Sequence, residues 1–345
     1  MRAFTLSIIT FVTLVISAIA DDACSGPHTR TQPPDGAFVV DASGKHSGSV
    51  RTISAAVARL THTEKDQTIF VLPGVYREQV VLPELSGPLV LQGYTCNTMS
   101  YDANQVTITQ SKAQRDLPSE ITSGRNELTA TLLVESDNVK LYNLNVANTA
   151  NHTRKNGQAV ALSVDGNNCG VYGSQIMGYQ DTVFANKGRE LFARSLISGA
   201  IDFIFGAYAL LWCESCDIKT IGAGSITANG RDGASSPSFY VFNKARVSGS
   251  NGKGSTFLGR PWRKFARVVW QNSELGDVIN PLGWQKWNND PDTDNVFFGE
   301  FNNTGPGAVP GQRASFSKQL TTQVPITQIL GDNYRNEWFV DTTYL

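Results

Sequence analysis

Residues 174–184 read SQIMGYQDTVF, and residues 195–205 read SLISGAIDFIF. Serine, isoleucine, glycine, aspartate, a β-branched residue and phenylalanine recur at matching places 21 residues apart, and a weaker third copy places Cys216 and Ile218 at the first two of them. Repeats of this length, built from short apolar runs, are typical of a parallel β-helix, because each coil buries its inward side chains by stacking on its neighbours. Parallel crossovers of this kind are almost always right-handed.

The rest of the chain supports an all-β fold. Short runs of Val, Ile, Leu, Phe and Thr alternate with Gly and Asn, and one segment, residues 53–60, has the apolar spacing of a helix. No Pro-rich, Ser-rich or single-charge stretch divides residues 21–345. The sequence therefore predicts a right-handed parallel β-helix as one domain over residues 21–345.

The N-terminus has the features of a secretory signal peptide. A basic start is followed by an uncharged, largely apolar stretch over residues 3–19 and by the small residues Ala18 and Ala20. A membrane anchor is the alternative, but the stretch is short for a span and an acidic pair, Asp21-Asp22, follows it. We expect residues 1–20 to be removed and the protein to be secreted to the extracellular space, with no membrane attachment.

Charge and cysteine content exclude other classes. The net charge is −1 and charged residues make up 17% of the chain, so no basic surface for nucleic acid is expected, and an acidic substrate would need a few placed arginines. The five cysteines leave at least one thiol unpaired, and their pairing stays open. No second CxxC or nearby histidine completes a metal site with Cys213 and Cys216, which we expect to be buried or disulfide-linked. Asn151 and Asn302 begin glycosylation sequons.

Asp181 and Asp202 occupy the same position in the two repeats. Strands one coil apart lie about 4.8 Å from each other, so the two carboxylates should project side by side. Repulsion between them would leave one protonated while the other is charged, which provides an acid and a nucleophile. The alternative is a pair of turn residues, although an idle charge beside such apolar runs would be costly.

Three further residues could complete an ester-cleaving site. Gln180 precedes one aspartate and Gln158 lies in a strand-like run about one coil upstream, so both amides could donate to an oxyanion; structural hydrogen bonding is the alternative. Arg260 could hold a carboxylate ionised through two parallel bonds, with Trp262 beside it for a sugar ring; the alternative is a surface arginine near a buried tryptophan. No G-x-S-x-G, HExxH, P-loop or dinucleotide motif is present, and no histidine lies in either repeat.

The ordered motifs resemble those of the pectin methylesterase family, most closely its secreted microbial or fungal members. They are Gly74-Val-Tyr76-Arg-Glu78, Gly157-Gln158-Ala-Val-Ala-Leu162, Gly178-Tyr-Gln180-Asp181-Thr-Val183, Asp202-Phe-Ile-Phe205-Gly206, Thr227-Ala-Asn-Gly-Arg231 and Leu258-Gly-Arg260-Pro-Trp262. The resemblance implies a β-helix that removes methyl esters from homogalacturonan, acts without metal or organic cofactor, and is a monomer.

Residue roles follow from the same resemblance. It implies that Asp202 is the nucleophile and Asp181 the general acid and then base, that Gln158 and Gln180 form the oxyanion hole, and that Arg260 orients Asp202. It further implies substrate contacts from four aromatic residues: Trp262, Trp284, Phe205 and Phe184. Many family members carry tyrosine where this chain has Phe184.

Two rival readings remain open. A β-helix polygalacturonase or pectate lyase would cleave the glycosidic bond, and carboxylates one coil apart would suit a retaining glycosidase better than an inverting one. A non-catalytic carbohydrate-binding β-helix would not need the full aspartate, glutamine and arginine set.

Overall fold

The computed structural model describes residues 24–150, 157–288 and 292–345. The predicted signal peptide and the Asn151 sequon lie outside these ranges, whereas Asn302 is described and exposed. Among the described residues, no helix has the length and apolar character needed to cross a membrane.

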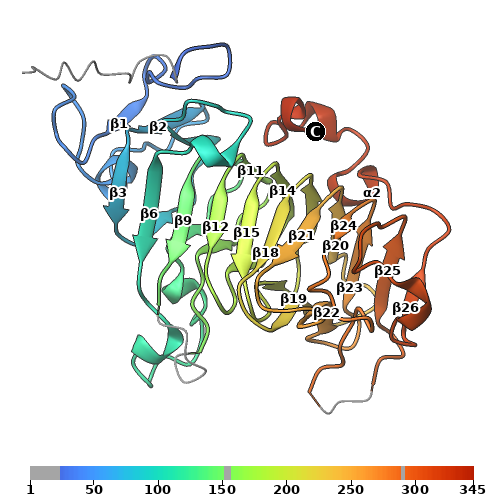
Figure 1. The fold of residues 1–345 in the computed structure, drawn as a ribbon. Coiled ribbons are helices and arrows are strands. Elements are labelled where there is room, and N and C mark those ends of the chain that lie inside the picture. The colour runs from blue at the N-terminus through green and yellow to red at the C-terminus, as the bar shows by residue number, and fades with distance from the viewer. Residues whose placement is uncertain (1–23, 151–156, 289–291) are drawn as a thin grey trace, which may run out of the picture.

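Three long sheets make up the molecule (Figure 1). The 11-stranded sheet contains β1 (Phe38–Val40), β2 (Gln67–Val71), β5 (Leu89–Gly93), β8 (Val139–Tyr142), β11 (Cys169–Tyr172), β14 (Arg189–Ala193), β17 (Leu210–Glu214), β20 (Phe239–Asn243), β23 (Arg267–Gln271), β25 (Phe297–Phe301) and β26 (Ser317–Gln319). The 8-stranded sheet contains β3 (Gly74–Arg77), β6 (Val106–Gln110), β9 (Asn145–Asn148), β12 (Gln175–Met177), β15 (Leu196–Gly199), β18 (Asp217–Thr220), β21 (Arg246–Gly249) and β24 (Glu274–Leu275). The 7-stranded sheet contains β4 (Val80–Leu82), β7 (Leu132–Val134), β10 (Leu162–Val164), β13 (Val183–Ala185), β16 (Ile204–Gly206), β19 (Gly224–Asn229) and β22 (Thr256–Pro261).

Each coil contributes one strand to each sheet: one coil contains β11, β12 and β13, and the next contains β14, β15 and β16. Strands of successive coils pair in parallel, β11 with β14, β12 with β15 and β13 with β16. In Figure 1 the 8-stranded sheet faces the viewer and the coils advance from the blue N-terminal end to the red C-terminal end. The predicted all-β parallel β-helix is confirmed.

The register explains the 21-residue repeat. Ile176 pairs with Ile197, and Ile197 with Ile218, so the isoleucines form a stack. All three are fully buried in the core between the sheets. The repeated serine also has a structural role, because the hydroxyl of Ser195 accepts a hydrogen bond of 3.1 Å from the backbone N–H of Ser174.

From β8 to β25, the chain leaves each strand of the 11-stranded sheet through one residue with positive φ. The seven turn residues have φ between 48° and 54°: Asn143, Gly173, Arg194, Ser215, Lys244, Asn272 and Asn302. Glycine and asparagine adopt this left-handed conformation most readily. Their recurrence at this corner keeps successive coils in step.

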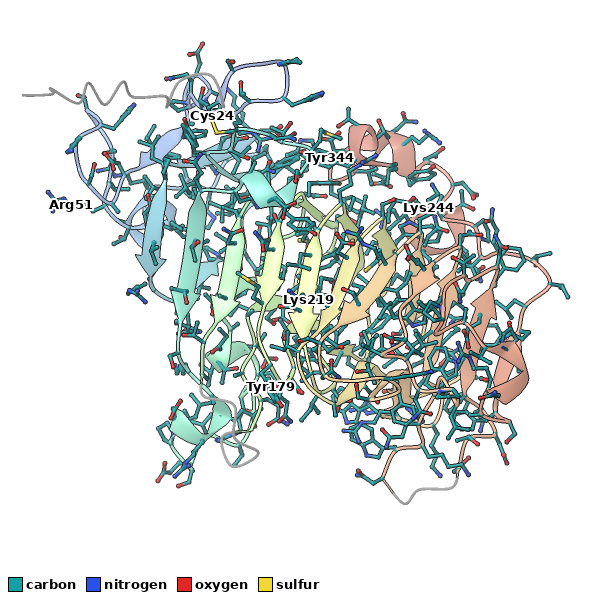
Figure 2. The ribbon with its side chains drawn as sticks, in the orientation of Figure 1. Cys24, Arg51, Tyr179, Lys219, Lys244 and Tyr344 are labelled. Carbon is teal, nitrogen blue, oxygen red and sulfur yellow. A yellow bond between two sulfur atoms is a disulfide. The ribbon has the colours of Figure 1, made fainter. Side chains whose placement is uncertain are left out.

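Other segments cover the N-terminal strands and one outer face of the β-helix. The predicted helix exists as α1 (Ile53–Val57), shorter than the expected 53–60, and it packs on β1, β2 and β4. The C-terminal segment, which includes α2 (Thr327–Leu330), packs against the outer side of the 11-stranded sheet, where Tyr344 contacts Tyr142 and Tyr172 (Figure 2).

One disulfide, Cys24–Cys96, lies near the N-terminal end, where Figure 2 shows Cys24. The other three cysteines, Cys169, Cys213 and Cys216, are buried free thiols. Cys213 and Cys216 were expected to be buried or disulfide-linked, and the structure shows them buried and not disulfide-linked.

Candidate active site

Asp181 and Asp202 stand immediately before two neighbouring strands of the 7-stranded sheet, Asp181 before β13 and Asp202 before β16. Phe184 pairs with Phe205 across these strands, so the aspartates hold equivalent places on successive coils. Both have left-handed backbones, with φ of 61° and 50°. Such conformations are uncommon for residues other than glycine and cluster at functional sites. The expected alignment of the two aspartates is present.

Arg260 makes the two aspartates unequal. Its Nε donates to Oδ1 of Asp202 at 2.8 Å and its Nη2 to Oδ2 at 2.6 Å. The guanidinium thus occupies both oxygens of Asp202 in a two-pronged ion pair. Oδ1 of Asp181, in contrast, is buried without a hydrogen-bond partner among the described residues.

The pKa values follow this difference. Burial raises the pKa of Asp181 well above its usual range, the charge of Asp202 raises it further, and Arg260 lowers it. Burial also raises the pKa of Asp202, but the hydrogen bonds and charge of Arg260 oppose the shift. Asp181 is therefore the carboxyl group that keeps a proton more readily, and Asp202 is the one whose ionised form is stabilised.

A cavity of about 280 Å³, the central cavity, lies over the pair. Its lining comes from the 7-stranded sheet and from the segments before β7 and after β22: Gln114, Asn126, Gln158, Gln180, Asp181, Asp202, Phe205, Ala228, Arg260, Trp262, Trp287 and Asn288. All five predicted catalytic residues thus meet at one site, and both glutamine side chains lie at its wall.

The predicted aromatic contacts divide into two groups. Phe205 and Trp262 line the central cavity. Phe184 does not line it; its ring stacks on Phe205 at a centroid distance of 4.6 Å and supports that ring from the neighbouring coil. The ring of Trp262 is tilted against Phe205 at a centroid distance of 6.2 Å.

Trp284 is not at the site, contrary to the expectation that it would stack on a sugar. It is 1% exposed in the core, where its indole stacks on Phe298 and donates to Glu300 at 3.1 Å. Trp287, three residues later, lines the central cavity, and the guanidinium of Arg260 lies 4.2 Å from its ring. Of these two tryptophans, Trp287 and not Trp284 reaches the cavity.

Sequence reasoning also missed Gln114 and Asn126, whose side chains join through a hydrogen bond of 2.6 Å at the cavity wall. They come from the long connection between β6 and β7, which lies outside the repeat. The only signal for Trp287 was its place in the W-x-x-W sequence that starts at Trp284.

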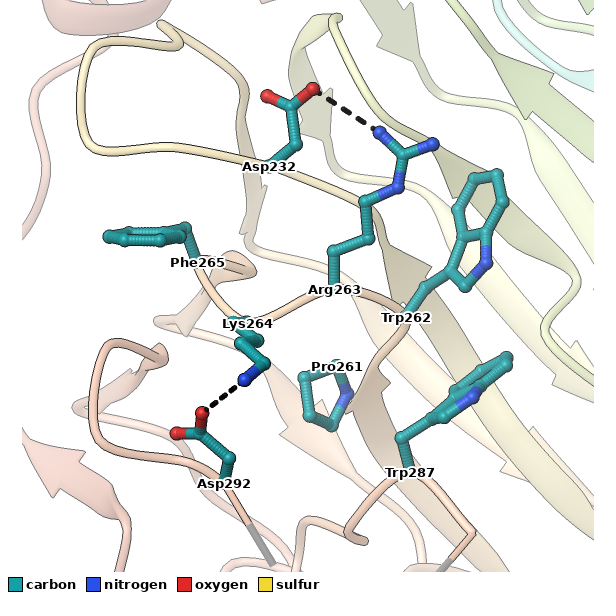
Figure 3. Close-up of a pocket in the computed structure, with 8 residues that line it drawn as sticks. All are labelled: Asp232, Pro261, Trp262, Arg263, Lys264, Phe265, Trp287 and Asp292. Atoms are coloured by element: carbon teal, nitrogen blue, oxygen red, sulfur yellow. Dashed lines mark hydrogen bonds and ion pairs between the residues drawn. The ribbon is translucent and has the colours of Figure 1, made fainter. Parts of the chain in front are cut away.

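Two further cavities adjoin the central one. The Ser225 cavity, about 580 Å³, shares Gln180, Arg260 and Asn288 with it. The Arg263 cavity, about 280 Å³, shares Trp262 and Trp287 with it (Figure 3). The three cavities therefore adjoin one another through these shared residues.

No group of three His, Cys, Asp or Glu side chains that could hold a metal ion occurs in residues 24–150, 157–288 and 292–345. The site can nevertheless supply a buried acid, an arginine-bound carboxylate and neutral amide donors. A parallel β-helix with this groove and this carboxylate pair defines a class of hydrolase that acts on an extended substrate.

Comparisons with known proteins place the chain within that class. The family model for pectinesterase matches residues 38–336. A pectinesterase of Aspergillus aculeatus is 42% identical over 92% of this chain and 94% of its own length, and one of Aspergillus niger is 41% identical over 96% and 98%. The chain belongs to the pectinesterase family, and these relatives support pectin methylesterase activity.

Solved structures agree with this assignment. The crystal structure of the pectin methylesterase from Aspergillus niger superposes with a TM-score of 0.82 at 35% identity, covering 92% of this chain and all of that one. Pectin methylesterase from carrot gives a TM-score of 0.77 at 29% identity, covering 88% and 96%.

Proposed function

We propose that this protein hydrolyses the C6 methyl esters of homogalacturonan through an acyl-enzyme on Asp202. The observation that carries the proposal is the unequal environment of the aspartates: Arg260 binds both oxygens of Asp202, while Asp181 is buried beside it with one oxygen unbound by any described residue. A stabilised carboxylate next to a carboxylic acid supplies a nucleophile and a proton donor.

In the first half-reaction, an ionised oxygen of Asp202 attacks the ester carbonyl carbon. Negative charge develops on the carbonyl oxygen, and the side-chain N–H groups of Gln158 and Gln180 donate to it. The C–O bond to the methoxy group breaks as Asp181 gives that oxygen its proton. Methanol leaves, and the sugar is held to Asp202 as an anhydride.

In the second half-reaction, the now ionised Asp181 takes a proton from water as the water oxygen attacks the same carbonyl carbon. The bond to Asp202 breaks and restores its carboxylate beside Arg260. Asp181 is protonated again, and the polymer has gained one carboxyl group. The overall change is one ester and one water converted to one acid and one methanol.

The groove gives this chemistry a polymeric substrate. Trp262, Trp287 and Phe205 provide flat apolar surfaces against which sugar rings can pack, and the side cavities extend the site in two directions. We further propose that the protein acts outside the cell as a monomer, since the Cys24–Cys96 disulfide suits an oxidising compartment and a signal-like segment precedes it.

Methanol release from highly methyl-esterified pectin, with polymer length followed in parallel, tests this function. We expect one methanol for each new carboxyl group and no new reducing ends. New reducing ends without methanol would overturn the proposal in favour of a glycosidic-bond-cleaving enzyme.

A further inference from the structure

Trp284 lies beside a buried ion pair. The side chains of Glu300 and Arg313 are each 4% exposed. Nε of Arg313 donates to Oε1 of Glu300 at 2.8 Å, and its Nη2 donates to Oε2 at 2.9 Å. The indole N–H of Trp284 donates to the same Oε1 at 3.1 Å. The chemistry proposed for Asp202 and Asp181 uses none of these three groups.

Trp284 belongs to a segment, residues 281–288, that lies against β22, the end strand of the 7-stranded sheet. Gly259 of β22 pairs in parallel with Trp284, and the backbone N–H of Gln285 donates to the carbonyl of Gly259 at 3.0 Å. A Cβ added at Gly259 would lie 3.2 Å from the ring of Trp284. The indole therefore packs directly on the strand residue that precedes Arg260.

Arg313 holds the start of the same segment. Its Nη1 donates to the carbonyl of Pro281 at 3.0 Å. Gly283 has a φ of 67°, and a Cβ added there would lie 2.7 Å from Cδ of Arg313, so the guanidinium stem packs directly on this turn. A shift of the segment would separate buried charges or leave the Trp284 N–H unpaired, and both are costly. The buried ion pair therefore fixes the position of residues 281–288.

The end of the segment contacts Arg260. The ring of Trp287 lies 4.2 Å from the guanidinium carbon of Arg260, whose nitrogens bind both oxygens of Asp202. A guanidinium that stacks on an aromatic face is held in one plane, which also orients its hydrogen-bonding edge. The buried ion pair and Asp202 are thus connected by direct contacts and by the short stretch of backbone from Trp284 to Trp287.

We propose that Trp284 is a positioning residue for Arg260. The buried ion pair holds its indole, the segment places Trp287 on the guanidinium, and the guanidinium stays aligned with both oxygens of Asp202. This inference rests on the proposed role of Asp202 as nucleophile, and it assigns no substrate contact to Trp284.

A misaligned Arg260 would change the pH at which Asp202 ionises. Among the described residues that line the central cavity, the charged side chains are those of Asp181, Asp202 and Arg260. Arg260 opposes the effect of burial on the pKa of Asp202. A weaker contact would therefore raise that pKa and move the acidic limb of the pH profile of kcat/KM to higher pH.

The pH profile of kcat/KM for methanol release from pectin tests the proposal. Trp284→Phe keeps a buried ring and removes the indole N–H. Trp212→Phe is the matched control, because the buried indole of Trp212 donates to Oε2 of Glu214 at 3.0 Å in the 11-stranded sheet. Trp287→Leu removes the ring from Arg260 at a half-buried position, and the double variant shows whether Trp284 acts through Trp287.

We expect Trp284→Phe to move the acidic limb by about 0.3 to 1 pH unit to higher pH. On that limb kcat/KM then falls about twofold to tenfold, the range for one hydrogen bond. Trp287→Leu should move the limb in the same direction, and the double variant should move it no further than Trp287→Leu alone. Trp212→Phe should leave the limb in place, whatever it does to Tm.

A merely structural Trp284 would lower Tm and leave the limb in place, and that result would overturn the proposal. Equal movements of the limb in Trp284→Phe and Trp212→Phe would overturn it as well. If Trp284→Phe does not fold, Trp287→Leu decides, because a limb that stays in place in this variant contradicts the proposed contact with Arg260.

Exchange of the Arg260 Nε–H with solvent is a separate readout that needs no substrate. NMR of protein containing isotope-labelled arginine would follow it, with the signal assigned by its loss in Arg260→Gln. We expect Trp284→Phe, but not Trp212→Phe, to speed this exchange about twofold to tenfold. If the exchange changes as expected and the wild type releases no methanol, the esterase chemistry is wrong and the positioning of Arg260 stands. If methanol is released and neither the exchange nor the limb changes, only the positioning role is wrong.

Discussion

The two aspartates are equivalent in the sequence repeat and become different only through Arg260. The strand register places Asp181 and Asp202 at the same point of successive coils. Arg260 comes from β22, two strands beyond Asp202 in the 7-stranded sheet, and contacts Asp202 with both prongs of its guanidinium. This one side chain, from two coils further along, therefore favours a proton on Asp181 and a negative charge on Asp202.

Replacing Asp181 by asparagine should remove the proton that methanol needs to leave. We expect kcat to fall by about 10²-fold to 10⁴-fold, the usual contribution of a general acid or base. Methanol release at saturating pectin measures this. A more acidic alcohol needs less help from a proton donor to leave, so the variant should lose less acylation activity on galacturonan esters of such alcohols. An equal loss of activity for every alcohol would contradict the assignment of Asp181 as the acid.

Arg260→Gln should move the acidic limb of the pH profile of kcat/KM to higher pH. Arg260 lowers the pKa of Asp202, so its loss raises that pKa and reduces the ionised fraction at any given acidic pH. We expect kcat/KM to fall about tenfold to a hundredfold as well, the range for a hydrogen bond between charged groups. Arg260→Lys, which keeps the charge, should shift the limb less. If the acidic limb of the pH profile did not move, Arg260 would have no effect on the ionisation of Asp202.

The sequence could predict the residues that meet at the central cavity because they recur with the coil or lie in motifs on strands. Asp181 and Asp202 share a repeat position, and Arg260 lies within β22. Gln114 and Asn126 could not be found this way, since the connection that carries them has no period. The prediction that Trp284 contacts the substrate was wrong because the sequence does not distinguish two tryptophans that lie three residues apart. Only the packing shows that Trp284 points into the core, where it stacks on Phe298.

At the scale of elements, one corner of the coil controls the regularity of the fold. The turn that follows each strand of the 11-stranded sheet from β8 to β25 uses a left-handed residue in seven successive coils. Asparagine or glycine fills four of these positions, but Ser215 and two basic residues fill the other three. Serine lacks the local preference that makes asparagine tolerate this conformation.

Ser215→Asn should therefore stabilise the protein by about 0.5–1 kcal/mol, because a left-handed residue other than glycine or asparagine costs about 1–2 kcal/mol. For a chain of this size we expect a rise in Tm of about 1–2 °C. Ser248→Asn, on an exposed strand position of β21, is the matched control and should give no rise. Equal effects of the two substitutions would contradict the account of this corner.

The 21-residue repeat could be recognised in the sequence only in coils whose turns contain no inserted residues. Strands β12 and β15 are offset by 21 residues, and so are β15 and β18, which made the repeat visible. Strands β7 and β10 are offset by 30 residues and β19 and β22 by 32, because their turns contain longer loops. Those loops carry part of the groove wall, so the irregular coils that hide the fold also build the site.

At the scale of the whole molecule, the interior holds a carboxyl group that the proposed chemistry does not use. Glu190 in β14 is fully buried, and neither of its carboxyl oxygens has a hydrogen-bond partner among the described residues. Burial raises its pKa well above the usual range, and the charge of Asp165 adds to this. The folded protein therefore holds Glu190 protonated where the unfolded chain would ionise it.

Glu190→Gln should remove a pH-dependent loss of stability. The pKa of Glu190 is 4.5 in the unfolded chain and higher in the folded protein. Below pH 4.5 Glu190 is protonated in both states and does not lower the free energy of unfolding. As the pH rises from 4.5 towards the folded-state pKa, only the unfolded chain ionises Glu190, so the free energy of unfolding falls. The loss is about 1.4 kcal/mol for each pH unit in that window. Thermal unfolding at several pH values should show the Tm advantage of the variant growing from pH 4 to pH 7; a constant difference would contradict a buried, protonated Glu190.

The C-terminal segment covers the outer side of the 11-stranded sheet. Tyr142 and Tyr172 in the sheet meet Tyr344 near the end of the chain. Sequence periodicity predicted the β-helix but not this contact, because the aromatic residues of the C-terminal segment have no repeat that ties them to a coil. Their partners are set by the assembled surface of the whole sheet.

The proposed role of Asp202 is that of nucleophile in a methyl-ester hydrolase. Methanol release from highly methyl-esterified pectin by Asp202→Asn, beside wild type, tests it most directly, with near-ultraviolet circular dichroism to show that the variant is folded. We expect a folded variant whose methanol release is reduced to background, while the wild type releases methanol without shortening the polymer. A folded Asp202→Asn protein that still releases methanol at a substantial fraction of the wild-type rate would contradict it.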